Sequence, residues 1–274
     1  MALLGRRLAV SIPDTVLEEK ESLRDRTAKL GLMARACSIY GVDVIEVFRD
    51  QSGRGGAAEI RKVLEYLETP QYLRKRIYPL DETLRYAGVL PPLRIPSHRA
   101  RVAFEEIPPG QGREGVVNAD GTVDVGLDVH PRLQGRPAAG SRVTVRISSL
   151  RPPVAELVSR EKVGEYWGYR VEVRSMAEAL ADPRYGVKIA TSRLGTPLAG
   201  ALGLLGPAIR GAQGIKLIFG SPSKGLNQLA GGELAKKVDF VVNLFPGQQV
   251  ETVRTEEAVF AGLGLLGFIL AEKA

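Results

Sequence analysis

The stretch Val238-Asp-Phe-Val-Val-Asn-Leu-Phe-Pro-Gly-Gln-Gln-Val-Glu-Thr-Val-Arg-Thr-Glu-Glu-Ala258 decides the fold of the C-terminal half of the chain. Its apolar residues up to position 245 predict a strand, and Pro246-Gly247 predicts a sharp turn into a polar loop. Thr255 can cap a helix, which we expect to continue through the apolar residues 258–270. That run is too short to span a bilayer, so it predicts a buried or interface helix and no membrane partner.

The composition of the chain is that of a globular protein with a basic character. With 274 residues, 44 % of them hydrophobic, it can form one or two domains around a buried core. The single cysteine, Cys37, excludes a disulfide framework. Two histidines, His98 and His130, are too few for a zinc site, so we expect no metal. The net charge of +7 favours an anionic partner such as nucleic acid, although many basic proteins have no specific one.

The cellular compartment is also suggested by the sequence. A single cysteine suits a reducing environment. The start of the chain, Met1 to Arg7, leads into a strand and lacks the apolar region of a signal peptide. We therefore expect a cytoplasmic location.

The first ninety residues alternate between strand and helix patterns. Residues 7–12 predict a buried strand, and Asp14 is the expected cap of a helix that ends at Gly41. Residues 42–48 predict a second strand, a flexible loop follows at 50–56, and residues 57–67 predict a second helix. This alternation indicates a parallel sheet covered by helices, an α/β fold.

The pattern changes after Pro91-Pro92. Short alternating runs at 102–104, 116–117, 123–127 and 143–147 predict a small all-β barrel, with an OB-fold the favoured type. Residues 94–162 contain eleven Lys and Arg residues against eight Asp and Glu residues, and one aromatic residue. Such a barrel would bind RNA mainly through phosphates, without stacking bases. The alternative is a rigid spacer.

The α/β alternation resumes after Trp167. Strands are predicted at 169–173, 187–190, 215–219 and 238–245, and a short helix at 176–181. We therefore expect a discontinuous α/β domain of residues 1–93 and 164–274, with the barrel inserted as residues 94–163.

Two glycine-rich motifs are misleading. Residues 262–267 match the dinucleotide pattern GxGxxG, but they lie inside a helical run and follow no strand. Small residues for close helix packing explain them better. Residues 220–225 are similar to a phosphate-binding loop, but the lysine precedes the second glycine, so the Walker A pattern fails.

Three loops that follow predicted strands form the candidate site: 191–195, 219–226 and 244–254. Because ligands of open α/β sheets bind beyond the carboxyl ends of the strands, we expect these loops to surround a small ligand. Their glycines could instead serve turn geometry alone.

Together these segments resemble the SPOUT methyltransferases, which carry a trefoil knot near the C-terminus. Arg35-Ala-Cys-Ser-Ile-Tyr-Gly-Val-Asp43 is similar to the first motif of the family, and Phe219-Gly-Ser-Pro-Ser-Lys-Gly-Leu226 to the second. Leu244-Phe-Pro-Gly247 with Val253-Arg-Thr-Glu-Glu-Ala258 is similar to the third. The ribose-methylating branch has Ser-Leu-Asn where this chain has Thr252-Val-Arg254. The barrel insertion and this variant resemble an archaeal and eukaryotic branch of RNA methyltransferases.

The resemblance implies an enzyme that uses S-adenosylmethionine as its cofactor. It implies a homodimer, formed through the knot region and the C-terminal helix, that acts on structured RNA (rRNA or tRNA), on a base in preference to a ribose. The cofactor-binding residues it implies are Thr191, Ser192, Gly195, Phe219, Gly220, Ser221, Leu226, Leu244, Phe245, Pro246, Gly247, Val253 and Ala258. A non-catalytic RNA-binding or ribosome-assembly factor that keeps the knot is the alternative.

Four residues are candidates for catalysis. Arg35 and Arg193 could hold the RNA near the methyl group, although Arg35 could instead form a structural ion pair. Arg254 could order the loop or bind phosphate. Glu256 could act as a general base if the target is a protonated ring nitrogen, but its place at a helix start also explains a carboxylate.

Overall fold

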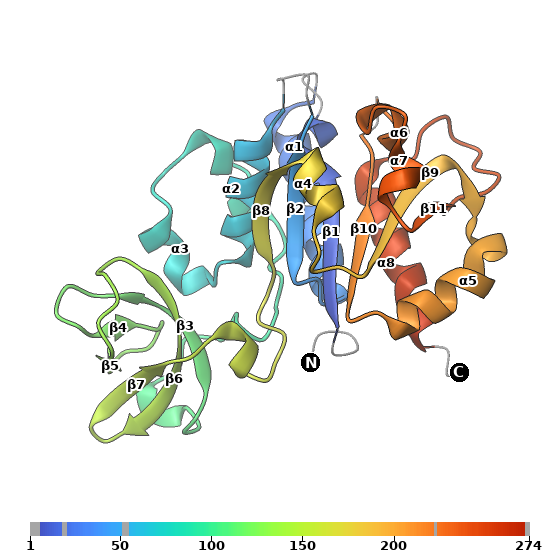
Figure 1. Cartoon of the computed structure of the whole chain (residues 1–274). Helices are drawn as coiled ribbons and strands as arrows, with labels where there is room; N and C mark the ends of the chain where they lie inside the picture. Colours follow the sequence, from blue (N-terminus) through green and yellow to red (C-terminus); the bar gives the residue numbers. More distant parts are fainter. Residues whose placement is uncertain (1–5, 18–20, 51–54, 222–223, 272–274) are drawn as a thin grey trace. The chain divides into compact units, whose positions relative to one another are not determined.

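The computed structural model describes residues 6–17, 21–50, 55–221 and 224–271. Of the loop expected at 50–56, residues 51–54 lie outside these ranges. The chain divides into two compact units (Figure 1). The smaller unit comprises Tyr66–Asp81 and Pro92–Gly168, and the larger unit contains the other described residues. From the sequence we expected residues 66–81 to belong to the α/β domain, and the structure groups them with the inserted segment.

The larger unit is built on a six-stranded sheet in the order β11-β9-β10-β1-β2-β8, and every neighbouring pair is parallel. The strands are β1 (Arg7–Pro13), β2 (Val44–Arg49), β8 (Arg170–Ser175), β9 (Val187–Pro197), β10 (Gly214–Ile218) and β11 (Phe240–Asn243). The central strands are apolar along most of their length because helices cover both faces. The predicted parallel α/β fold is confirmed.

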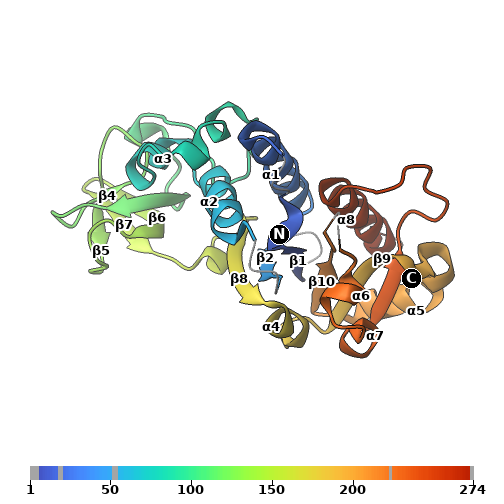
Figure 2. The same cartoon turned by 90° about the horizontal axis from the view of Figure 1, so that it is seen from above.

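Helices flank this sheet on both sides (Figure 2). On one face lie α1 (Leu23–Ile39) and α8 (Thr255–Ala271), which pack against each other. The opposite face carries α4 (Met176–Ala181), α6 (Leu226–Leu229) and α7 (Leu234–Lys237). Two further helices are α2 (Ala57–Glu68) and α5 (Leu198–Gly211), and short 3₁₀ helices occur at η3 (Glu82–Leu84) and η4 (Ala87–Val89).

The start of α1 differs from the prediction. Asp14 lies in a short 3₁₀ helix, η2 (Asp14–Val16), and its Oδ1 accepts a hydrogen bond from the backbone N–H of Asp50. Ser22 caps α1 instead, accepting from the N–H of Asp25 at 3.2 Å. The expected cap was wrong because a contact distant in sequence occupies the Asp14 carboxylate.

Charged side chains are buried near the middle of the larger sheet, where they form ion pairs and hydrogen bonds. The Nζ of Lys216 donates to Glu46 Oε1 at 2.9 Å and to the carbonyl of Ala179 at 2.7 Å, and both charged side chains are fully buried. Asp182 lies 3.7 Å from the same ammonium. Burial would raise the pKa of Asp182, but hydrogen bonds from Arg184 and the charge of Lys216 hold it at about 2. These pairs satisfy polar groups that an apolar strand pattern does not predict.

The smaller unit contains a five-stranded sheet in the order β4-β3-β6-β7-β5. Its strands are β3 (Gly112–Val117), β4 (Val123–Asp124), β5 (Arg132–Gln134), β6 (Arg142–Leu150) and β7 (Pro153–Leu157). All ladders are antiparallel except that between β5 and β7. A bridge between Thr122 and Arg132 joins the two ends of the sheet. Its core is Phe104, Ile107, Val117, Val123, Val125, Leu127, Leu133, Val145, Ile147 and Ala155.

Some local predictions for this unit were wrong. Residues 102–104 do not form a strand; Phe104 begins a 3₁₀ helix, η5 (Phe104–Glu106), and its side chain enters the core. The strand β5 was missed because it has three residues, and β7 because its sequence PVAEL lacks a regular alternation of apolar and polar residues. The helix α3 (Gln71–Ile77) and the 3₁₀ helix η6 (Arg160–Lys162) were also not expected.

A cluster of buried polar side chains covers the outer face of β3 and of the first half of β6. The carboxylate of Glu114 accepts hydrogen bonds from Thr144, Trp167 and Arg142 at 2.5–2.6 Å. Arg142 also reaches Glu68 at 2.8 Å. Burial would raise the pKa of Glu114, but the arginines and these donors lower it, so the carboxylate stays ionised. The cluster fixes β3 and the first half of β6 beneath Glu68 and Trp167.

Candidate functional site

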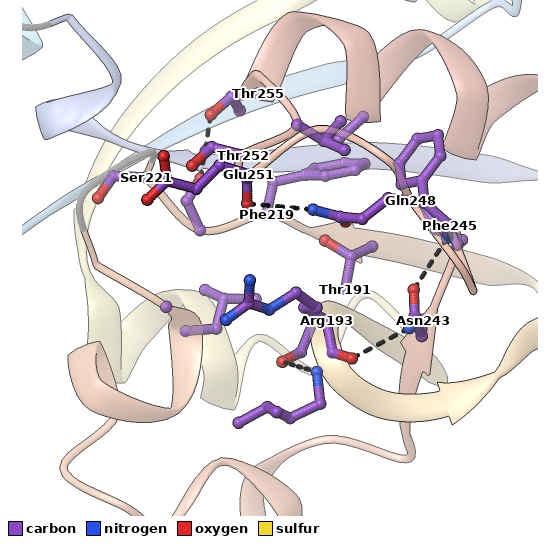
Figure 3. A pocket seen from close by; sticks show the side chains of 18 residues that line it. Thr191, Arg193, Phe219, Ser221, Asn243, Phe245, Gln248, Glu251, Thr252 and Thr255 are labelled. Atoms are coloured by element: carbon purple, nitrogen blue, oxygen red, sulfur yellow. Dashed lines mark hydrogen bonds between the residues drawn. The ribbon is translucent and has the colours of Figure 1, made fainter.

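A cavity of about 390 Å³ lies beyond the carboxyl ends of β9, β10 and β11 in the larger unit (Figure 3). The loops after β10 and β11 line it, as the sequence predicted. Residues 191–194 were predicted as a loop after a strand at 187–190, but they lie inside the longer strand β9, in an irregular stretch between the residues that pair with Val241 and Val242; this stretch is called the loop of β9. Its lining residues are Thr191, Ser192, Arg193, Leu194, Phe219, Gly220, Ser221, Gly225, Leu226, Asn243, Leu244, Phe245, Gln248, Glu251, Thr252, Val253, Thr255 and Ala258.

The loop of β9 is fixed from two sides. The hydroxyl of Thr191 donates to the carbonyl of Ile218 on the adjacent strand at 3.2 Å. The amide of Asn243 at the end of β11 donates to the carbonyl of Arg193 at 3.0 Å. The side-chain oxygen of Asn243 also accepts from the backbone N–H of Phe245 at 2.9 Å (Figure 3). Asn243 thus holds the first and third loops in register.

The loop of β10 closes on itself. The hydroxyl of Ser221 accepts from the N–H of Lys224 at 3.0 Å, and the N–H of Ser221 donates to the carbonyl of Lys224 at 3.1 Å. The Nζ of Lys224 pairs with the buried carboxylate of Asp50 at 3.0 Å. A Cβ at Gly220 would lie 3.2 Å from the Lys224 carbonyl oxygen, so the tight loop suits glycine there. The loop is therefore tied to the end of β2.

The loop between β11 and α8 contributes the polar residues Gln248, Glu251 and Thr252 to the lining. The side-chain amide of Gln248 donates to the carbonyls of Val250 and Glu251 at 2.9 and 3.2 Å. The hydroxyl of Thr255, the first residue of α8, donates to the carbonyl of Gly220 at 3.1 Å (Figure 3). This contact links the start of α8 to the loop of β10.

The cavity combines apolar surfaces with few charges. Phe219, Leu226 and Val253 are among its apolar lining residues, while Arg193 and Glu251 are its charged ones. Hydroxyl groups and exposed backbone atoms supply the remaining polar contacts. Such a lining suits a small ligand that has an apolar or aromatic part and groups of both charges.

Most of the predicted cofactor-binding residues meet at this cavity. Those that line it are Thr191, Ser192, Phe219, Gly220, Ser221, Leu226, Leu244, Phe245, Val253 and Ala258. Gly195, Pro246 and Gly247 do not line it. A Cβ at Gly195 would lie 2.7 Å from the backbone of Val242, so this glycine allows β9 and β11 to approach closely. Gly247 has a φ of +77°, which explains a glycine at that turn. The role of each residue in binding stays a prediction.

Of the four candidate catalytic residues, Arg193 alone lines the cavity. Arg35 is half-buried on α1. Arg254 is exposed just before α8, and its backbone N–H donates to Glu257 Oε2 at 2.9 Å. Glu256 is buried in the first turn of α8, and its Oε2 has no hydrogen-bond partner in the described part of the chain. The catalytic assignments of all four stay predictions.

Seven lining residues were not singled out individually from the sequence. Leu194, Gly225, Gln248, Glu251 and Thr252 lie in the segments expected to surround the ligand, whereas Asn243 and Thr255 lie just outside them. Asn243 could have been found, because it is a polar residue at the carboxyl end of an apolar strand. Glu251 follows no such rule, since only the path of the loop brings it to the cavity.

A search of the described residues finds no group of three His, Cys, Asp or Glu side chains that could hold a metal ion. Among the described helices, none has the length and hydropathy needed to cross a membrane.

The chain matches a family model and several known proteins. The family, described as "Putative RNA methyltransferase", matches residues 7–266. A protein of Halobacterium salinarum described as uncharacterized is 36 % identical over 285 residues, which cover 94 % of this chain and 98 % of that protein. The 28S rRNA (uridine-N(3))-methyltransferase of Homo sapiens is 33 % identical over 305 residues, covering 94 % of this chain and 77 % of that protein.

Solved structures also match. The crystal structure of a protein from Bordetella pertussis, titled "Probable Methyltransferase", aligns with a TM-score of 0.45 at 12 % sequence identity. The alignment covers 98 % of this chain and 99 % of that one.

Proposed function

Because the chain belongs to this family of RNA methyltransferases, of the SPOUT class, we propose that it uses S-adenosylmethionine to methylate N3 of a uridine in large-subunit ribosomal RNA. The observation that carries the proposal is the cavity of three strand-end loops within the matched residues. The substrate base is inferred from the relatives of Homo sapiens, Mus musculus and Drosophila melanogaster, which share the name 28S rRNA (uridine-N(3))-methyltransferase.

The cavity fits the proposed cofactor. Its volume of about 390 Å³ falls within the range of about 300–1,000 Å³ typical of small-molecule pockets. Phe219, Leu226 and Leu244 would cover the adenine, and Glu251 would lie near the positive groups of the ligand. When bound, S-adenosylmethionine supplies an electrophilic methyl group and needs no metal. The rigid loops then contribute by positioning.

Methylation at N3 of uridine requires that the ring nitrogen lose a proton, since its lone pair forms the new bond to carbon. Glu251 is the carboxylate that lines the cavity, whereas Glu256 is buried beneath the start of α8 and does not. We therefore assign proton acceptance to Glu251 instead of Glu256. Arg193, exposed at the same cavity, would hold an RNA phosphate beside the reacting base.

The proposed trefoil knot is supported by the path of the last elements. The strand β11 lies at the edge of the sheet beside β9, but α8 returns across the sheet to pack on α1. On the way its first residue, Thr255, bonds to Gly220 in the loop after β10. In a trefoil knot the C-terminal segment passes through an earlier loop, and this path of α8 past the loop after β10 is the path that such a passage requires.

The proposed homodimer is supported by an apolar surface on α1 and α8. Leu32 and Ile39 are exposed seven residues apart on α1, and Phe260 and Phe268 are exposed eight residues apart on α8. The ring of Tyr40 contacts Phe260 with centroids 6.0 Å apart, so the two helices present one surface. A second copy of the chain is the proposed occupant. Light scattering should give a dimer mass for the wild type and a monomer mass for Phe268→Glu.

The smaller unit is proposed to be an OB-type barrel that contacts RNA. The support is the connectivity of its five strands, β3 to β7 in chain order. The first, β3, pairs with the second and the fourth, β4 and β6, and the third, β5, runs parallel to the fifth, β7. The bridge from Thr122 to Arg132 joins the second and third. This is the arrangement of a five-stranded Greek-key barrel. The cytoplasmic location stays a prediction.

Calorimetric titration with S-adenosylmethionine, followed by transfer of a tritiated methyl group to large-subunit rRNA, tests the proposal. We expect saturable binding at one site per chain and RNA that becomes labelled. Folded protein that neither binds the cofactor nor labels the RNA would contradict it.

A further inference from the structure

We propose that the outward face of β5, β7 and the second half of β6 is the surface by which the smaller unit holds the ribose–phosphate backbone of the substrate RNA. This inference rests on the proposed function and assigns the contact to particular residues. We call this surface the β5 face; it is defined by Arg132, Gln134, Arg136, Arg146 and Lys162.

The two parts of the outer sheet surface differ in what covers them. Over β3 and the first half of β6, the side chains of Glu114 and Thr144 are buried beneath Trp167. Over β5, by contrast, Arg132 and Gln134 are exposed on either side of the buried Leu133. Alternation along a strand therefore directs both polar side chains outward, away from the core that Leu133 enters.

Part of the positive charge of the β5 face is not neutralised by ion pairs within the described residues. Within the described residues, Arg132 and Arg136 form no ion pair with a carboxylate, and both are exposed. Across the sheet, Gln134 lies opposite Glu156, which lies opposite Arg146. Glu156 and Arg146 pair with each other at 3.5 Å.

The face extends to η6 and carries an excess of positive charge. A guanidinium nitrogen of Arg146 donates to the carbonyl of Lys162 at 3.1 Å, so this exposed lysine adjoins the same surface. The face with η6 thus carries four cations, Arg132, Arg136, Arg146 and Lys162, against the carboxylates of Glu156 and Glu161. Elsewhere in the unit, Arg151 is paired with Glu105 at 3.2 Å.

The chemistry of the face points to phosphate recognition. None of the residues in β5, β6 or β7 is aromatic, so these strands offer no aromatic ring on which bases could stack. Arg132 and Gln134 are two residues apart on an extended strand, about 6.6 Å along it, which is comparable to the spacing of successive phosphates. Guanidinium groups bind phosphates through paired hydrogen bonds. The face would therefore hold RNA by its backbone, independently of sequence, while the base is selected elsewhere.

The test removes the two arginines of the β5 face that have no carboxylate partner among the described residues. Arg132→Gln with Arg136→Gln lowers the net charge by two, and Arg85→Gln with Arg151→Gln is a matched control, because both control arginines are exposed and paired with glutamates. The probe is a fluorescein-labelled RNA hairpin, titrated at several salt concentrations. Each phosphate contact adds about 0.9 to the slope of log K against log salt, so the first variant should lose about 2 from this slope. Its affinity near 0.1 M salt should fall at least tenfold, and that of the control less than twofold.

Two additional measurements keep the inference separate from the proposed function. S-adenosylmethionine should bind the variant with wild-type affinity, which shows that the fold is intact. Arg132→Lys with Arg136→Lys should recover most of the salt slope.

An unchanged slope and affinity in the Gln variant would overturn the inference, even if the wild type methylates RNA. Loss of binding to phosphatidylserine vesicles with unchanged RNA binding would also overturn it, in favour of a lipid surface. Absence of cofactor binding by the wild type would instead contradict the proposed function.

Discussion

The two compact units present opposite kinds of surface. In the larger unit, a cavity is formed by three loops whose backbone is held by hydrogen bonds, such as those of Asn243, and charged residues are few in its lining. In the smaller unit, strands present exposed cations such as Arg132, and no large cavity is required. We infer that the shape of the cavity determines what the larger unit binds, and that surface charge determines what the smaller unit binds. Changes of volume should therefore affect the cofactor, and changes of charge should affect RNA.

The largest effect is expected from filling the cavity. Ala258 lines it from the first turns of α8, and Ala258→Phe should lower the affinity for S-adenosylmethionine at least about a hundredfold, since the ring would occupy ligand volume. RNA-hairpin binding should change less than twofold. Calorimetry and fluorescence anisotropy measure the two affinities.

The matched control is Ala199→Phe, at an exposed position of α5 that does not line the cavity. It should bind the cofactor normally. If Ala258→Phe also binds normally, the cavity is not the cofactor site and the contrast between the two units fails.

The next effect concerns the proposed proton acceptor. Glu251→Gln should lower kcat about 100-fold, at the lower end of the usual contribution of a general base, and leave cofactor affinity within about threefold. Glu256→Gln, at the buried position outside the cavity, should act mainly on stability. Single-turnover methyl transfer separates the two. If Glu256→Gln loses methyl transfer while Glu251→Gln keeps it, the assignment is reversed.

A smaller effect should follow from loosening the loop after β10. Lys224→Met removes the ammonium that holds this loop to the buried carboxylate of Asp50. We expect about tenfold weaker cofactor binding, because the loop would no longer be preorganised. Lys236→Met, in an exposed pair with Glu233, should leave the affinity unchanged. Equal effects of the two substitutions would show that net charge, and not loop position, controls the cavity.

The smallest effect concerns the pH dependence of stability in the smaller unit. Burial lowers the pKa of His98 to about 4, and the positive charges of Arg74 and Arg142 act in the same direction, while the hydrogen bond between Nε2 and the carbonyl of Glu68 opposes the shift only in part. A lowered pKa favours the neutral ring, so this stabilisation is complete above about pH 6.5 and is lost as the pH falls towards 4. Between pH 7.5 and 5.5 the free energy of unfolding should fall about 1 kcal/mol more in the wild type than in His98→Gln. Urea unfolding at both pH values measures this; equal losses in the two proteins would show that His98 does not titrate in this way.

The sequence predicts an element well when residues close in sequence determine it, and poorly when contacts distant in sequence determine it. The strands of the larger sheet followed from local apolar runs, and α4 was predicted at its observed bounds, where Ser175 and Glu178 form a capping box. The start of α1 was wrong because the Asp14 carboxylate is used by the distant N–H of Asp50. The helix α5 was missed because its glycines and Pro207 disfavour helix locally, so packing must stabilise it.

The same distinction applies to the candidate site. The loops at the ends of β10 and β11 were predictable, since a parallel sheet brings the carboxyl ends of its strands together. The segment 191–194 was correctly placed at the cavity but wrongly taken as a loop, because β9 continues to Pro197. The place of Glu251 was not, because it depends on the course of a long loop. The exclusion of Gly195 and Gly247 from the lining was also not predictable, since a glycine required for close packing or a turn has the same sequence signal as one that contacts a ligand.

The most direct test of the central claim is to identify the methylated atom. Large-subunit rRNA is incubated with the protein and S-adenosylmethionine carrying a deuterated methyl group, and its nucleosides are then analysed by mass spectrometry. The account predicts deuterated 3-methyluridine with the wild type and none with Ala258→Phe. Label on a ribose oxygen, or equal labelling by the two proteins, would contradict it.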